Sequence, residues 1–135
     1  MSHQPRFFRR QAFDGFVVVF VDGEIDVAVA GILAEELEAT IDDCSPAMLV
    51  DLTNVTFMDS SALSTLIRVH KYAGSRGGGI RLVGPNARVS RLLEITHLDH
   101  LLPVHDTIEA AAEGLQPPEL TDTVKQADPV NGVAE

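Results

Sequence analysis

The sequence has no tryptophan, a single cysteine and no long apolar run, and each absence narrows what the protein can be. One thiol, Cys44, cannot form an internal disulfide, which is typical of proteins from a reducing compartment. We expect Cys44 to be structural, with an intermolecular disulfide as the alternative. The longest apolar stretch, residues 16–21, is far shorter than the ~20 residues of a membrane-spanning helix. We therefore predict no membrane insertion and a cytoplasmic location.

Positive charge is also scarce, because 10 Lys and Arg residues stand against 20 Asp and Glu residues, for a formal net charge of −10. Nucleic acids and anionic lipid surfaces bind basic patches, so neither is an expected partner. Arg9 and Arg10 are followed by Gln-Ala-Phe-Asp rather than by an apolar run, so we expect no signal peptide. A chain of 135 residues is long enough for one domain with a single aliphatic core.

Strand-like and helix-like patterns alternate along most of the chain. Asp14-Gly15 predicts a hairpin turn, and Asp22-Gly23 predicts the end of the strand that follows it. The expected strands are residues 6–13, 16–21, 47–52 and 80–83, and the expected helices are residues 27–42, 60–73, 87–95 and 108–115. Residues 101–104 could add an edge strand or a turn. This order predicts an α/β fold with a partly parallel sheet that begins with an antiparallel hairpin.

Residues 117–135 differ in composition from the rest. Pro117-Pro118, scattered acids and small polar residues offer too little apolar surface for a packed core. We therefore predict a folded domain over residues 1–116 and a disordered acidic tail over residues 117–135.

The most informative segment runs from Asp51 to Leu63, where an apolar strand leads through a short polar loop to a helix that begins with Ser60 and Ser61. Backbone N–H groups at a helix start lack intrahelical partners and carry a partial positive charge. A hydroxyl there can cap the helix, and a phosphate on that hydroxyl is also tolerated. From spacing alone, the two serines are either an N-cap and a first-turn residue or a regulatory site.

This segment, DLTNVTFMDSSALSTLI, resembles the signature of STAS domains, the fold of bacterial anti-sigma factor antagonists, in which Asp-Ser-Ser-Gly-Leu follows a strand. Gly23-Glu-Ile-Asp26 resembles the family's Gly-Glu-Leu-Asp, and residues 96–104 resemble its C-terminal Thr-Gly-Leu region. The likeness covers residues 5–115. It implies a STAS-like single domain with a mixed sheet of four to five strands and about four helices.

The resemblance also implies a function without catalysis, that of an anti-sigma factor antagonist. In this reading the unphosphorylated chain binds an anti-sigma factor serine kinase, phosphorylation of Ser60 breaks the complex, and a serine phosphatase restores the starting state. Ser61 is the less favoured acceptor. The implied partner-binding residues are Asp22, Gly23, Asp26, Asp59, Ser60, Ser61, Ser64 and Arg68. The alternative is an unphosphorylated STAS subunit of a transporter or lipid-transport complex.

The sequence departs from the family pattern at two positions. Ala62 stands where Gly is usual, and His97 stands where a second Gly is common. With ordinary helical angles, Ala62 would favour the helix. If a partner backbone must approach closely there, its methyl group would instead hinder docking.

Four aspartates, Asp22, Asp26, Asp51 and Asp59, fall near expected strand ends or helix starts. Such a group could hold Mg²⁺ beside a phosphoacceptor, as in two-component receiver domains, but those domains need a lysine at a later strand end, and Lys71 lies within an expected helix. We favour Asp26 as an N-cap, with Asp51 and Asp59 shaping the loop before Ser60.

Three other patterns do not match known sites. The spacing of His97, His100 and His105 fits no zinc motif, and residues 76–79 lack the Gly-Lys-Ser/Thr ending of a phosphate loop. No Gly-x-Ser-x-Gly elbow is present for a hydrolase serine. We therefore expect no metal, no cofactor and no enzymatic activity.

Overall fold

The computed structural model describes residues 8–115, so the tail predicted for residues 117–135 lies outside the described part. The strands are β1 (Phe8–Phe13), β2 (Phe16–Ile25), β3 (Ala47–Met58), β4 (Gly79–Val83) and β5 (Val104–His105). The helices are α1 (Val27–Asp43), α2 (Ser60–Gly74), α3 (Ala87–Ile95) and α4 (Ile108–Ala112), with a 3-10 turn at Leu98–His100. The sheet order is β1-β2-β3-β4-β5, antiparallel between β1 and β2 and parallel elsewhere. The predicted mixed α/β fold is confirmed.

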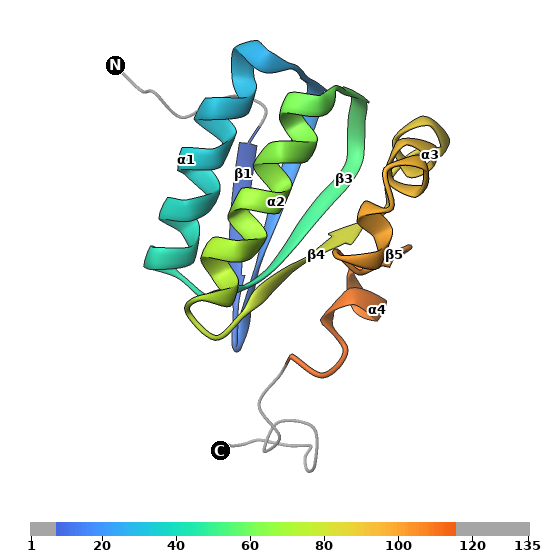
Figure 1. The fold of residues 1–135 in the computed structure, drawn as a ribbon. Helices are drawn as coiled ribbons and strands as arrows, with labels where there is room; N and C mark the ends of the chain where they lie inside the picture. The colour runs from blue at the N-terminus through green and yellow to red at the C-terminus, as the bar shows by residue number, and fades with distance from the viewer. Residues whose placement is uncertain (1–7, 116–135) are drawn as a thin grey trace.

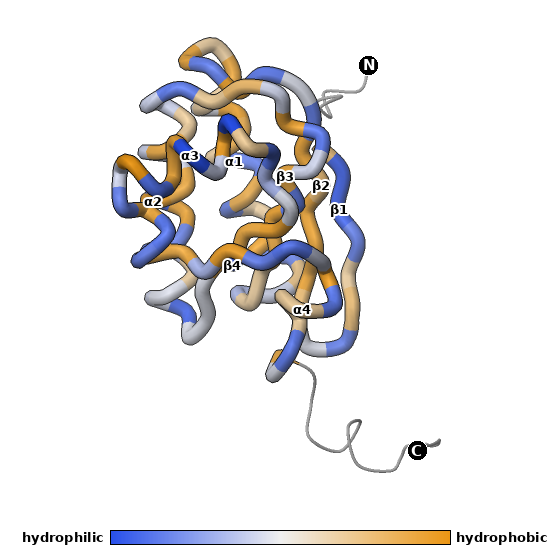
Figure 2. The backbone as a smooth tube through the Cα atoms, turned by 90° about the vertical axis from the view of Figure 1, so that its right-hand side faces the viewer, coloured by the Kyte–Doolittle hydropathy of each residue, from blue (hydrophilic) through white to orange (hydrophobic). Residues whose placement is uncertain are grey.

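Helices α1 and α2 lie side by side against one face of the sheet (Figure 1). The larger apolar core lies between this face and the two helices, and it includes Leu33, Leu37, Val50, Leu66 and Leu82. In Figure 2 the tube is mostly orange along β2, whereas much of the outer strand β1 is blue. Central strands are buried on both faces and outer strands are not, which accounts for this contrast. Within the described residues, no helix is both long enough and apolar enough to cross a membrane.

The second face of the sheet carries a smaller core. Phe16, Val18 and Leu49 meet Ala111 and Ala112 there, so the short helix α4 covers only part of this face. The helix ends at Ala112, earlier than the predicted Leu115. Its terminal carbonyl groups are bound from the sheet, because Nη1 of Arg81 donates to the carbonyl oxygens of Ala111 (2.7 Å) and Glu113 (3.0 Å).

The expectation that Asp22-Gly23 ends the second strand is wrong. Strand β2 continues to Ile25 by pairing with β3, which itself continues to Met58 rather than ending at residue 52. Two register shifts in this stretch and the positive φ of Gly23 (87°) mark a β-bulge. A bulge bends a strand without ending its ladder, so a turn-like dipeptide is compatible with continued pairing.

His97 lies between α3 and the 3-10 turn, with φ 62° and ψ 17°. This left-handed conformation favours glycine, and a side chain there is strained by roughly 1 kcal/mol. A glycine at this position, as in the pattern that the sequence resembles, would be free of this strain.

We expect His97→Gly to raise the free energy of unfolding by up to about 1 kcal/mol, because relief of strain exceeds the added freedom of the unfolded chain. Urea unfolding measures the change. His100→Gly is the matched control, since His100 is exposed but has no positive φ, and it should be destabilising. Equal losses in both variants would contradict the strain at His97.

His70 connects the second half of α2 to the sheet. Its Nδ1 accepts a hydrogen bond from the backbone N–H of Ile80 at 3.1 Å, and the side chain is half-buried. Burial lowers the pKa of His70 below its ordinary value, because the charged imidazolium is disfavoured there. The folded protein therefore holds this ring neutral where the unfolded chain begins to protonate it.

This pKa difference predicts that stability falls as the pH drops from about 7.5 to about 5.5, since the unfolded state then binds more protons than the folded state. His70→Asn keeps an acceptor for Ile80 and removes the titration, so other groups cancel in the comparison. Thermal unfolding of both proteins across this range should show the wild type losing more stability toward acid. A constant difference between the two would refute the prediction.

Candidate functional site

Asp59, not a serine, is the N-cap of α2. Its Oδ1 accepts hydrogen bonds from the backbone N–H groups of Ser61 (2.9 Å) and Ala62 (3.2 Å). Ser60 is the first helical residue, it is exposed, and its hydroxyl has no hydrogen bond within the part of the chain that the structure describes. The interpretation of Ser60 as a cap is therefore wrong, and its hydroxyl is accessible to solvent at the amino end of a long helix.

The next two residues turn progressively inward. Ser61 is half-buried, and Ala62 is fully buried with its side chain in the larger core. Ala62 occupies an ordinary helical position, so it favours the helix, which was the first of the two alternatives for this residue. Its methyl group contacts the core and does not face a partner.

The starts of α1 and α2 lie next to each other at the carboxyl ends of β2 and β3. Asp26 is the N-cap of α1, as predicted, and its Oδ1 accepts from the N–H of Ala28 at 3.0 Å. The backbone N–H of Asp59 donates to the carbonyl oxygen of Ile25 at 3.3 Å. This hydrogen bond joins the residues just before the two helices, so both N-caps lie at one edge of the domain.

Residues 22–26 and 57–68 contain all the residues for which the sequence implied partner binding, and we name them the docking surface after that expectation. Within it, Ser64 is exposed one turn after Ser60, and Asp22 and Gly23 lie in the bulge of β2, opposite Asn54 and Val55. Backbone geometry thus brings the predicted residues of two separate segments to the same end of the sheet.

Arg68 lies two turns from Ser60, about 12 Å along the helix axis. Its guanidinium donates two hydrogen bonds to the carboxylate of Glu38 on α1, from Nε at 2.9 Å and from Nη2 at 3.2 Å. This hydrogen-bonded pairing raises the pKa of Arg68 above its ordinary value. Arg68 therefore already links α1 to α2, although its side chain remains 60% exposed.

Two exposed apolar side chains in and beside the docking surface were missed by sequence reasoning. Val27, directly after Asp26, is 75% exposed, and Phe57, two residues before Asp59, is 37% exposed. Val27 could have been found, because it lies outside the inward stripe of Ala30, Leu33 and Leu37. Contiguous exposed apolar patches mark protein-binding sites, whereas single exposed apolar side chains are common on protein surfaces.

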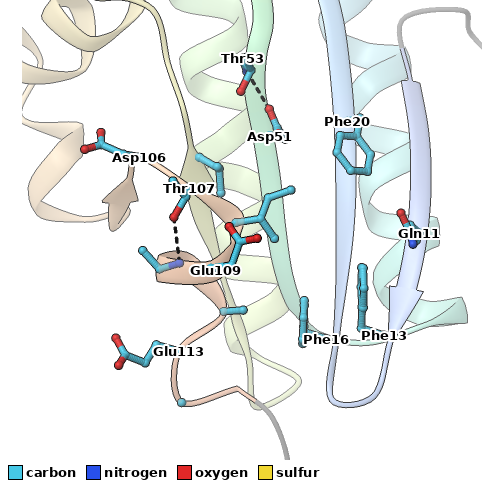
Figure 3. Close-up of a pocket in the computed structure, with 15 residues that line it drawn as sticks. Gln11, Phe13, Phe16, Phe20, Asp51, Thr53, Asp106, Thr107, Glu109 and Glu113 are labelled. Carbon is cyan, nitrogen blue, oxygen red and sulfur yellow. Dashed lines mark hydrogen bonds between the residues drawn. The ribbon is translucent and has the colours of Figure 1, made fainter.

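Asp51 was expected to shape the loop before Ser60, and this expectation is wrong. It lies in the middle of β3, where its Oδ1 accepts from the N–H of Thr53 at 2.8 Å, and it faces a groove on the second face of the sheet (Figure 3). Alternation of side chains along a strand sends neighbouring positions to opposite faces, and the strand is longer than predicted. The four aspartates are therefore not one cluster.

The other candidate groups also remain dispersed. Among residues 8–115, no three His, Cys, Asp or Glu side chains are arranged to hold a metal ion. The rings of His97 and His100 lie 5.5 Å apart, while His105 belongs to β5. Cys44 is exposed at the C-cap of α1, where its N–H donates to the carbonyl oxygen of Thr40.

The chain is similar to known proteins along most of its length. The profile of the STAS domain family matches residues 8–111. A Thermotoga neapolitana protein, named provisionally as the homologue of an anti-sigma factor antagonist, is 41% identical over 69 residues, which cover 51% of this chain but only 61% of that relative. The anti-sigma-B factor antagonist of Staphylococcus aureus is 33% identical over 71% of this chain and 89% of its own length.

A solved structure is also similar along most of the chain. The crystal structure of an anti-sigma factor antagonist from Mycobacterium paratuberculosis is 32% identical, with a TM-score of 0.69 over 80% of this chain and 92% of that one. The sequence match, the shared fold and the Asp-Ser-Ser start of α2 lead to one conclusion: the chain belongs to the STAS domain family.

Proposed function

We propose that the chain is a non-enzymatic, cytoplasmic anti-sigma factor antagonist whose docking surface binds an anti-sigma factor serine kinase. The kinase transfers the γ-phosphoryl group of ATP to Oγ of Ser60, releasing ADP and a proton, and the complex then dissociates. A serine phosphatase hydrolyses the phosphate and restores binding, which places sigma-factor-dependent transcription under control of this one residue. The observation that carries the proposal is that the hydroxyl of Ser60 is exposed at the start of α2 and makes no hydrogen bond within residues 8–115.

The local electrostatics favour a change in binding rather than a change in fold. A phosphate adds about 1.5–2 negative charges at neutral pH. The amino end of α2 stabilises that charge by roughly 0.3–1 kcal/mol, whereas the neighbouring carboxylate of Asp59 opposes it. Because Ser60 is exposed, neither effect requires the core to move.

The balance differs once a partner covers the site. Burying a poorly paired charge costs several kcal/mol, and each 1.4 kcal/mol or so lowers affinity about tenfold. The exposed side chains of Val27 and Phe57 provide apolar area for the unphosphorylated complex, next to the serine that controls it. Phosphorylation therefore acts at the interface.

We expect incubation with a purified anti-sigma factor kinase of the same organism and ATP to add one phosphate to the wild type and to Ser61→Ala, and none to Ser60→Ala. Ser60 is exposed, whereas Ser61 is half-buried and its N–H is held by Asp59. Intact-mass spectrometry counts the phosphates. Labelling that persists in Ser60→Ala and disappears in Ser61→Ala would assign the acceptor to the other serine.

We expect Ser60→Asp to unfold at nearly the wild-type temperature and to bind the kinase at least about tenfold more weakly, because the charge matters only when covered. Ser60→Asn is the matched control, with the same shape and no charge, and should retain most of the affinity. Differential scanning calorimetry and titration calorimetry measure the two quantities. A large loss of stability, or equal affinity losses in both variants, would contradict the proposed mechanism.

A further inference from the structure

The second face of the sheet has a groove of about 980 Å³ between the β1–β2 hairpin and α4 (Figure 3). Phe13, Phe16 and Phe20 line it on the hairpin side, and Ile108 and Ala112 line it on the α4 side. None of its lining residues belongs to the docking surface around Ser60. The groove is therefore a separate feature of the molecule.

The aromatic side of the groove is incompletely covered. The ring of Phe13 stacks on that of Phe16, with centroids 4.9 Å apart, yet Phe13 remains 43% exposed. Phe20 is half-buried, with the guanidinium of Arg9 at 4.1 Å from its ring centroid. Parallel strands in α/β proteins are normally covered by helices on both faces, and among the helices of residues 8–115 only the five-residue α4 packs on this one. The incompletely covered side of the groove therefore suits one more helix lying beside α4.

The polar lining of the groove has one sign of charge. Four acidic residues line it, Asp51, Asp106, Glu109 and Glu113, and no Lys or Arg does. The carboxylate of Glu109 points toward the strands, whereas those of Asp106 and Glu113 point away from the hairpin and lie at the rim (Figure 3). None of the four belongs to a salt bridge within residues 8–115. Apolar walls of low dielectric strengthen the field of such groups. The complementary ligand carries positive charge around an apolar stripe.

We propose that this groove docks a basic amphipathic helix of another protein. Apolar side chains of that helix would cover Phe13, and its Lys or Arg side chains would pair with Glu109 and with Glu113 at the rim of the groove. Charge argues against the two occupants that the chain itself offers. A second copy carries a net charge of −10, and residues 117–135 contain four acids, Glu119, Asp122, Asp128 and Glu135, against one lysine.

The test uses the full chain and a fluorescent helical peptide of about 18 residues, with leucines on one face and lysines on the other. Fluorescence anisotropy should show saturable binding that weakens as salt rises, because screening reduces the attraction. A peptide with every lysine replaced by glutamate should not bind. Phe13→Ser, and the pair Glu109→Gln with Glu113→Gln, should each weaken binding by roughly tenfold.

A matched pair, Glu35→Gln with Glu94→Gln, removes the same charge from exposed positions outside the groove and should leave the affinity nearly unchanged. Thermal unfolding verifies that every variant is folded, and Ser60→Asp should bind the probe as the wild type does. Equal losses in the two glutamine pairs, or the lack of saturable binding, would overturn the proposal. A dimer in sedimentation experiments that Phe13→Ser abolishes would assign the groove to a second copy and would overturn it as well.

Discussion

The docking surface depends on the parallel pairing of β2 and β3 beyond the bulge at Gly23. Without the pairs Glu24–Phe57 and Ile25–Met58, the two strands would separate before their carboxyl ends. Their continued pairing places the carbonyl oxygen of Ile25 within reach of the N–H of Asp59. Two helices that follow different strands therefore start from one shared edge, and a partner can contact both starts at once.

At that edge, the helix cap and the proposed phosphoacceptor are different residues. The carboxylate of Asp59 satisfies two backbone N–H groups of α2, so helix stability does not require the hydroxyl of Ser60. If Ser60 were the cap, phosphorylation would alter the group that binds the first N–H groups of α2, although a helix start tolerates a phosphate. With Asp59 as the cap, the hydroxyl is exposed to solvent and available to a partner.

Much of this arrangement could be predicted from local sequence signals. Asp14-Gly15 located the hairpin, Asp26 was correctly identified as a cap, and α3 has the predicted bounds, with Asn86 as its N-cap. The bulge at Gly23 could not be predicted, because a dipeptide that ends one strand continues another when its neighbour pairs with it. The direction of Asp51 was missed for the same reason, since the length of β3 depends on contacts far away in the chain.

The division of the molecule into two faces explains why added charge need not disturb folding. On α2, the buried side of Ala62, Leu66 and Val69 holds the helix to the sheet, while Ser60 and Ser64 lie on the opposite, solvated side. Helix α2 therefore contributes one set of side chains to the apolar core and a different set to the solvated surface. If Ser60 is phosphorylated as proposed, the added charge lies on the solvated side of α2, away from the side chains that pack in the core. The groove lies on the other face of the sheet, so the sheet and its core separate it from Ser60.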